Sequence, residues 1–148
     1  MELGVALGVI GAVIATCAGA GSAVAMGMVG QAAAGVIAED SRKFGQTLVL
    51  QAIGSTNGLY GLLIGFLILT KSMSVTDTST GLFLLASGVP IGVVGYLAAV
   101  AQGKTLVSGV ILIGKRPGEM AKALIYAAMI ETFAIFALLI SFLIYNSV

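Results

Sequence analysis

Glu131 is the residue best placed to do chemistry, because this carboxylate lies inside the apolar run of residues 126–136. An ionised side chain at the centre of a bilayer costs at least roughly 3 kcal/mol. Such a group must be neutralised by a proton, a cation or a partner side chain. The sequence therefore predicts an ion site at Glu131.

The composition indicates a membrane protein. Of the 148 residues, 59% are hydrophobic and 9% are charged, and the mean hydropathy is +1.13. Four apolar stretches each exceed the roughly 20 residues needed to cross hydrocarbon: residues 3–37, 45–70, 79–113 and 118–145. We expect an all-α integral membrane protein whose four transmembrane helices form two hairpins.

Basic residues predict the orientation of these hairpins. Arg42 and Lys43 fall in the first short loop, Lys115 and Arg116 in the third, and only Lys71 borders the middle one. Since positive charge marks the cytoplasmic side, the hairpin loops are expected in the cytoplasm and both termini on the opposite side. No basic residue precedes Arg42, so the first helix is expected to be retained rather than cleaved as a signal peptide.

Several function classes find no support in the sequence. The net charge of +1 gives no sign of a nucleic-acid partner, and the single Cys17 excludes an intramolecular disulfide. The chain has no His, no cluster suited to zinc and no Gly-rich phosphate loop after a strand. We expect no independent enzyme activity and no organic cofactor.

The two halves of the chain resemble each other. Residues 62–69 (LLIGFLIL) match residues 138–145 (LLISFLIY) at a spacing of 76. That offset places Ser55 opposite Glu131, so only the second half carries the carboxylate. We divide the chain into a first hairpin, 1–73, without an ion carboxylate and a second hairpin, 74–148, with Glu131. Both hairpins run in the same direction, so this is a parallel duplication and not the inverted repeat that builds many carriers. The difference counts against a carrier.

Small residues predict which helices lie inside. The third stretch has small residues at steps of three and four, which form one face suited to close backbone approach. In the first stretch they recur at steps of two and fall on opposite sides. The second and fourth stretches end in Leu, Ile and Phe, as lipid-facing helices do. Two thin helices inside and two bulky helices outside give the protein the form of a wedge, and identical wedges close into a ring through heterologous contacts. The alternative is that the small residues serve only tight packing within a monomer. The small face of the third stretch comprises Gly88, Gly92, Gly95, Ala99 and Gly103.

Polar residues of three stretches fall in one layer of the membrane. At 1.5 Å per residue, Glu131, Gln102, Thr56 and Asn57 lie roughly 18 to 21 Å from the nearest expected cytoplasmic loop. The first stretch has no polar side chain of comparable reach there. Steps of three and four place Thr56, Asn57 and Tyr60 on one face, which is expected to turn toward Glu131.

This layer supplies enough oxygen atoms for a cation. A carboxylate, the amides of Gln102 and Asn57, the Thr56 hydroxyl and a carbonyl near Ile53 give about five. One negative charge matches one monovalent cation, so Na⁺ is the expected cargo. A proton needs only the carboxylate and one or two acceptors, and H⁺ remains the alternative.

Two further features of the second stretch fit this site. Gly54 and Ser55 are weak helix formers that can loosen the helix and present a backbone carbonyl. Tyr60 can donate a hydrogen bond to Glu131 and fix its orientation.

Structural roles are the alternative to ion binding for the same polar residues. Glu131 could pair with Lys104 or Lys122, and Gln102 could serve only to join helices. Thr132 is expected to bond its own helix. Gln31, Gln51 and Lys104 lie nearer the cytoplasmic loops and are expected to be interfacial or ring-lining, without an ion role.

Three motifs resemble the proteolipid of V-type ATPases: residues 102–104 (QGK), 55–61 (STNGLYG) and 127–132 (AAMIET). The resemblance is closest to the K subunit of the sodium-pumping bacterial V-type (V/A-type) kind. It implies a rotor ring of identical subunits in a bacterial plasma membrane and in contact with lipid. It also implies partner subunits: a stator with an arginine facing Glu131, a central stalk, and subunits that hydrolyse ATP.

The same resemblance assigns roles to the predicted site. Glu131 would be the ion-carrying carboxylate and Tyr60 its hydrogen-bond partner. Na⁺ would be bound by Glu131, Gln102, Thr56, Asn57 and the Ile53 carbonyl.

This chain departs from the family in one segment. Residues 54–57 read Gly-Ser-Thr-Asn, whereas the sodium-pumping members commonly have Pro-Gly-Thr-Gln. Asn reaches one methylene less far than Gln. The consequence is a longer distance from ligand to ion, a water molecule between them, or a site that is selective for protons. A small ion-coupled carrier and a membrane scaffold are the alternatives from other classes.

Overall fold

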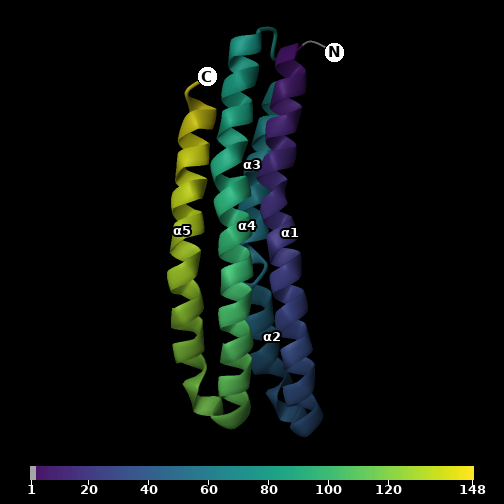
Figure 1. Cartoon of the computed structure of the whole chain (residues 1–148), viewed down its shortest axis with the longest axis vertical. Helices are drawn as coiled ribbons and strands as arrows, with labels where there is room; N and C mark the ends of the chain where they lie inside the picture. Colours follow the sequence, from purple (N-terminus) through teal and green to yellow (C-terminus); the bar gives the residue numbers. More distant parts are fainter. Residues whose placement is uncertain (1–2) are drawn as a thin grey trace.

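The computed structural model describes residues 3–148, and all regular elements within that range are helical. Met1 and Glu2, with which the expectation of a retained first helix began, lie outside the described residues. The helices run side by side along one axis (Figure 1). In chain order they are α1 (Leu3–Glu39), the 3₁₀ turn η1 (Ser41–Lys43), α2 (Phe44–Ile53), α3 (Thr56–Ser72), α4 (Thr78–Lys115), the 3₁₀ turn η2 (Pro117–Glu119) and α5 (Met120–Asn146).

Four segments are long and apolar enough to cross a membrane: Leu3–Glu39, Ser41–Ser72, Thr78–Lys115 and Pro117–Asn146. The prediction of an all-α protein with four membrane-spanning segments is confirmed. The second segment differs from expectation, since it consists of two helices, α2 and α3, separated at Gly54 and Ser55. The two hairpin loops lie at one end of the bundle, and the α3–α4 connection and the C-terminus lie at the other (Figure 1).

Glycines bring the backbones of α1 and α4 into contact. A Cβ atom added to Gly88 would lie 2.0 Å from the Gly11 carbonyl oxygen, and one added to Gly92 would lie 2.2 Å from that of Ile14. Near the start of α4, a Cβ on Gly81 would lie 2.3 Å from the Gly4 carbonyl oxygen. The small face predicted for the third span is therefore the surface that meets α1. Side chains at these positions would push the two helices apart.

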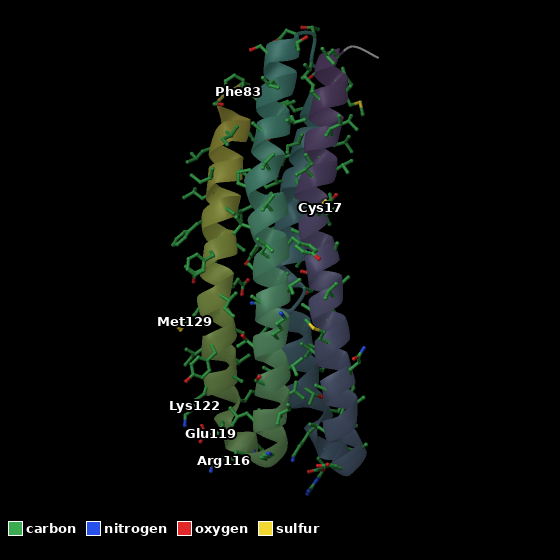
Figure 2. All side chains as sticks on the ribbon, viewed as in Figure 1. Cys17, Phe83, Arg116, Glu119, Lys122 and Met129 are labelled. Atoms are coloured by element: carbon green, nitrogen blue, oxygen red, sulfur yellow. The ribbon has the colours of Figure 1, made fainter. Side chains whose placement is uncertain are left out.

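The outer helices are bulky, as predicted. Figure 1 shows α4 between α1 and α5, while α3 packs against α1 and α4. Large apolar side chains of α3 and α5 point away from the bundle, including Met129 of α5 (Figure 2). This surface has the composition expected of one that meets lipid. Its exposed members include Leu62, Leu63, Phe66, Phe133, Phe136, Leu139 and Leu143.

Polar contacts join the two hairpin loops. Lys43 donates a hydrogen bond through Nζ to the Gly114 carbonyl, and Gln46 donates one through Nε2 to the Pro117 carbonyl at 3.1 Å. Arg116, Glu119 and Lys122 lie at this end of the bundle (Figure 2). These loops hold most of the basic residues that predicted the orientation.

Two aspartates stabilise helix starts. Asp40 accepts hydrogen bonds from the side chain and backbone of Arg42, and these bonds lower the pKa of the Asp40 carboxyl. At the start of α4, the Thr80 N–H donates to Asp77 at 2.7 Å and lowers the pKa of that carboxyl. A side chain of this kind satisfies an amide that has no partner within its helix.

We predict that Gly88→Ala lowers the free energy of unfolding by about 1 to 3 kcal/mol, because the added methyl forces α1 and α4 apart. Gly27→Ala is the matched control, since a Cβ atom at Gly27 has no neighbour within 4 Å. The control should leave the stability unchanged or raise it by up to about 1 kcal/mol. Thermal unfolding in detergent measures both. Equal effects of the two substitutions would contradict the contact.

Candidate ion-binding site

The second span is interrupted where the site begins. The amides of Gly54 and Ser55 bond to the carbonyls of Gln51 and Ala52, three residues back, at 3.1 and 3.0 Å. The Ile53 carbonyl, at the end of α2, accepts a hydrogen bond from the Thr56 hydroxyl at 3.0 Å. The expected irregularity at Gly54 and Ser55 is therefore present. Bonds between residues three apart replace the regular α-helical bonds between residues four apart.

Asn57, one residue into α3, is fully buried. Its Nδ2 donates a hydrogen bond to Oε1 of Gln102 on α4 at 2.9 Å. Its Oδ1 is buried without a hydrogen-bond partner, and within residues 3–148 it is the one buried side-chain oxygen or nitrogen of which this is true. An amide oxygen in this position costs free energy unless it meets a donor or a cation.

Gln102 is also fully buried and links α4 to α5. Its Nε2 donates to the Ala127 carbonyl at 3.2 Å and lies 3.4 Å from Oε2 of Glu131. Both acceptors require the amide nitrogen on that side, so Oε1 must face Asn57. Asn57 must then present its nitrogen to Gln102, which leaves its own oxygen free.

Glu131 of α5 is half-buried and accepts a hydrogen bond from the Tyr60 hydroxyl at 2.7 Å. The predicted contact of Tyr60 with Glu131 is present. The ion pairs described in residues 3–148 are Arg42–Asp40 and Lys122–Glu119, and neither includes Glu131. The structural alternative, in which Glu131 is neutralised by a lysine, therefore does not occur in this structure.

The structure joins four of the six predicted site residues. Asn57 contacts Gln102, Gln102 contacts Glu131, and Glu131 contacts Tyr60, from three different helices. Thr56 and Ile53 bond to each other, beside this network rather than within it. One carboxylate and neutral amide oxygens in apolar surroundings suit a proton or a monovalent cation. Ligation by all these residues stays a prediction.

Two polar residues near the break were not assigned to the site from sequence. Ser22 of α1 accepts a hydrogen bond from the Gly58 amide at 2.9 Å, and this short side chain does not reach the network around Glu131, in keeping with the expectation that the first span has no polar side chain of comparable reach. Gln51 donates through Nε2 to the Met26 carbonyl at 3.2 Å, inside the bundle. The internal repeat contained a signal for the Gln51 bond. The offset of 76 aligns Met26 with Gln102 and Gln51 with Ala127, which are the two partners of the corresponding bond in the second half.

Thr132 follows expectation, whereas the interfacial or ring-lining position of Gln31 and Lys104 stays a prediction. Thr132 donates to the Ala128 carbonyl of its own helix at 3.2 Å. Gln31 and Lys104 are exposed and border a shallow hollow between α1 and α4. Neither takes part in the network around Glu131.

Four membrane-spanning segments with one carboxylate held at mid-helix define a membrane protein of the proteolipid type. The family of the ATP synthase C subunits matches residues 10–68 and 85–144, so the chain belongs to that family. The two matched segments fall one in each half of the chain.

Two relatives narrow the comparison to K subunits. The chain is 42% identical over 126 residues to a V-type sodium ATPase subunit K of Enterococcus hirae, covering 85% of this chain and 81% of the relative. It is 37% identical over 139 residues to an A-type ATP synthase subunit K of Methanocaldococcus jannaschii, covering 93% of this chain and 61% of the relative. The predicted membership of the V/A-type proteolipids is confirmed.

We predict that Tyr60→Phe makes Glu131 react faster with carbodiimide, which attacks the protonated carboxyl. The substitution removes the hydroxyl that donates to Glu131 Oε1 at 2.7 Å and favours the ionised form, so the labelling rate should rise several-fold, up to about tenfold, in sodium-free buffer. Peptide mass spectrometry gives the labelling rate. Tyr126→Phe, on an exposed position of α5, is the control and should change nothing. An unchanged rate in Tyr60→Phe would show that the hydroxyl does not stabilise the carboxylate.

Proposed function

We propose that this chain is the rotor-ring subunit of a rotary V-type ATPase and carries Na⁺ across the membrane on Glu131. The observation that carries the proposal is the network of Asn57, Gln102, Glu131 and Tyr60 inside an apolar bundle. An ionised carboxylate at such a position costs free energy, and residues of this kind usually mark the pathway of an ion.

The unpartnered oxygen of Asn57 supports a cation as cargo. A proton on Glu131 satisfies the carboxylate but leaves Asn57 Oδ1 without a partner, whereas a cation can accept both oxygens as ligands. Glu131, Gln102, Thr56, Asn57 and the Ile53 carbonyl form the proposed ligand set. The sodium ATPase relative favours the same ion. H⁺ is the second candidate, because Asn57 replaces a longer glutamine.

The ring follows from the shape of the protomer. Small residues pair α1 with α4, and bulky residues of α3 and α5 face outward. Identical wedges of this form close around an axis through heterologous contacts. We propose that the two hairpins, 1–73 and 74–148, are the repeating units of that ring, and that only the second carries an ion.

The proposed mechanism alternates the affinity of Glu131 for its ion. Facing lipid, the carboxylate favours its neutralised, ion-bound state, because the bare charge is poorly solvated there. Facing a stator arginine, the bare carboxylate is stabilised by the guanidinium and releases the ion. Rotation between these surroundings is driven by ATP hydrolysis in partner subunits that a central stalk connects to the ring.

The distribution of charge supports an orientation. Arg42, Lys43, Lys115 and Arg116 gather at the end of the bundle that holds the hairpin loops. We propose that this end faces the cytoplasm and that both termini lie on the opposite side of a bacterial plasma membrane.

We predict that Na⁺ slows carbodiimide labelling of Glu131 in the purified wild-type protein at fixed pH, because the ion and the proton compete for one carboxylate. Glu131→Gln removes the reactive carboxyl, so loss of the label in this variant identifies Glu131 as the labelled residue. Labelling that is insensitive to Na⁺ would favour protons. A protein that transports solute when reconstituted alone, or that retains its function as Glu131→Gln, would instead favour the carrier or the scaffold.

Asn57→Leu tests the amide oxygen while keeping a side chain of similar size. It removes one proposed ligand and leaves Gln102 Oε1 without its donor, so the Na⁺ concentration for half-protection should rise at least about tenfold. Asn146→Leu is the control, since Asn146 is exposed and bonds the Phe142 carbonyl of its own helix. Equal protection in both variants would remove Asn57 from the ligand set.

A further inference from the structure

We propose that Ser22 and Gln51 are positioning residues, which fasten the break between α2 and α3 to α1 and so hold the Ile53 carbonyl in place for the ion. This inference rests on the proposed function, because it assigns the carbonyl to the cargo site. Neither residue is proposed to touch the ion.

Gln51 fastens the chain just before the break. Its Nε2 donates to the Met26 carbonyl of α1 at 3.2 Å, across the contact between the first two spans. Gly30 leaves room for this side chain, because a Cβ atom there would lie 2.7 Å from Gln51 Nε2. The end of α2 is also close to α1, since a Cβ atom on Gly54 would lie 3.5 Å from Met26 Cγ.

Ser22 fastens the chain just after the break. Its side chain is buried, with 5% of the residue exposed, and its Oγ accepts the Gly58 amide at 2.9 Å. The same amide lies 3.1 Å from the Ser55 carbonyl, so it is shared between the break and α1. A Cβ atom on Gly58 would lie 3.1 Å from Ser22 Oγ, which shows how closely the two backbones approach.

The break needs such support from outside its own helix. Regular helical bonds normally fix the direction of each carbonyl, and at the break the amides of Gly54 and Ser55 bond three residues back instead, while the Ile53 carbonyl accepts the Thr56 hydroxyl. The neighbouring helix α1 is a firm support, because its backbone contacts that of α4 along its length. The bonds to Met26 and Ser22 therefore hold both sides of the break to α1, whose backbone is in close contact with α4.

The internal repeat supports this role for Gln51. In the first hairpin Gln51 donates to the Met26 carbonyl, and in the second Gln102 donates to the Ala127 carbonyl, with both pairs 25 residues apart. The offset of 76 aligns Met26 with Gln102 and Gln51 with Ala127. Each hairpin thus has the same bond with donor and acceptor exchanged. In the second hairpin the glutamine also reaches Glu131, whereas Gln51 is left to hold the helix pair alone.

The positioning role predicts that sodium and proton binding respond differently. A proton needs only Glu131 and its partners Tyr60 and Gln102, whose hydrogen bonds to Glu131 involve neither Ser22 nor Gln51. Sodium additionally needs the proposed ligands at the break, which are the Ile53 carbonyl and the side-chain oxygens of Thr56 and Asn57. Loss of either fastening bond should therefore weaken sodium binding and leave proton binding unchanged.

The experiment compares Ser22→Ala and Gln51→Leu in the full-length protein, with carbodiimide labelling of Glu131 across Na⁺ concentration and across pH. For each variant we expect the half-protecting Na⁺ concentration to rise about fivefold, as for the loss of one hydrogen bond. The pH of half-maximal labelling without Na⁺ should not move. A shift of both quantities together would indicate a general loss of structure and overturn the positioning role.

Matched controls exist for both substitutions. Ser141→Ala removes a buried hydroxyl that accepts the Ile91 amide at 3.1 Å, and Gln46→Leu removes an amide that donates to the Pro117 carbonyl at 3.1 Å. Both controls should keep the wild-type sodium protection. Equal effects of the controls and the test variants would overturn the inference.

Hydrogen exchange separates this inference from the proposed function. In Ser22→Ala, amides of residues 54–58 should exchange faster than in the wild type, whereas Ser141→Ala should leave them unchanged. If Na⁺ does not protect the wild-type protein, the sodium function fails, and exchange at the break alone decides whether Ser22 and Gln51 hold it. Unchanged exchange in both variants would overturn the inference even if sodium protects Glu131.

Discussion

The structure depends on the cost of placing one carboxylate inside an apolar helix bundle. Glu131 has no lysine or arginine partner among the described residues, so its charge is managed by neutral groups, the Tyr60 hydroxyl and the Gln102 amide. Neutral donors stabilise the ionised form without cancelling its charge. The carboxylate can therefore still bind an ion, whereas a permanent salt bridge would remove that capacity.

Close packing of α1 and α4 makes this arrangement possible. Their backbones approach so closely that a side chain at Gly88 or Gly92 would collide with the facing carbonyl. Hydrophobic burial gives little reason for helices to associate within lipid, so contact of this kind and interhelical hydrogen bonds hold the bundle together. A rigid centre allows the outer span to be interrupted at Gly54 and Ser55 without loss of the fold.

Duplication followed by divergence explains why only one hairpin contains a carboxylate at mid-helix. The repeated glutamine bond lies on α2 in the first hairpin and on α4 in the second. Where the second hairpin has Glu131, the first has Ser55 at the helix break. The second half therefore contains the carboxylate and the buried glutamine, and the first half contains Tyr60, Asn57 and the helix break.

The sequence by itself determined the four membrane spans, the small face on α4, the isolated carboxylate and the family, because hydropathy, residue size and an isolated charge are local properties. It also indicated the layer shared by Glu131, Gln102 and Asn57, since depth follows from counting residues along a helix. Only the tertiary structure decided the roles of Ser22 and Gln51 and the orientation of the amides. Those features depend on which carbonyl of a neighbouring helix lies within hydrogen-bond reach, and spacing along one chain does not specify the rotation of one helix against another.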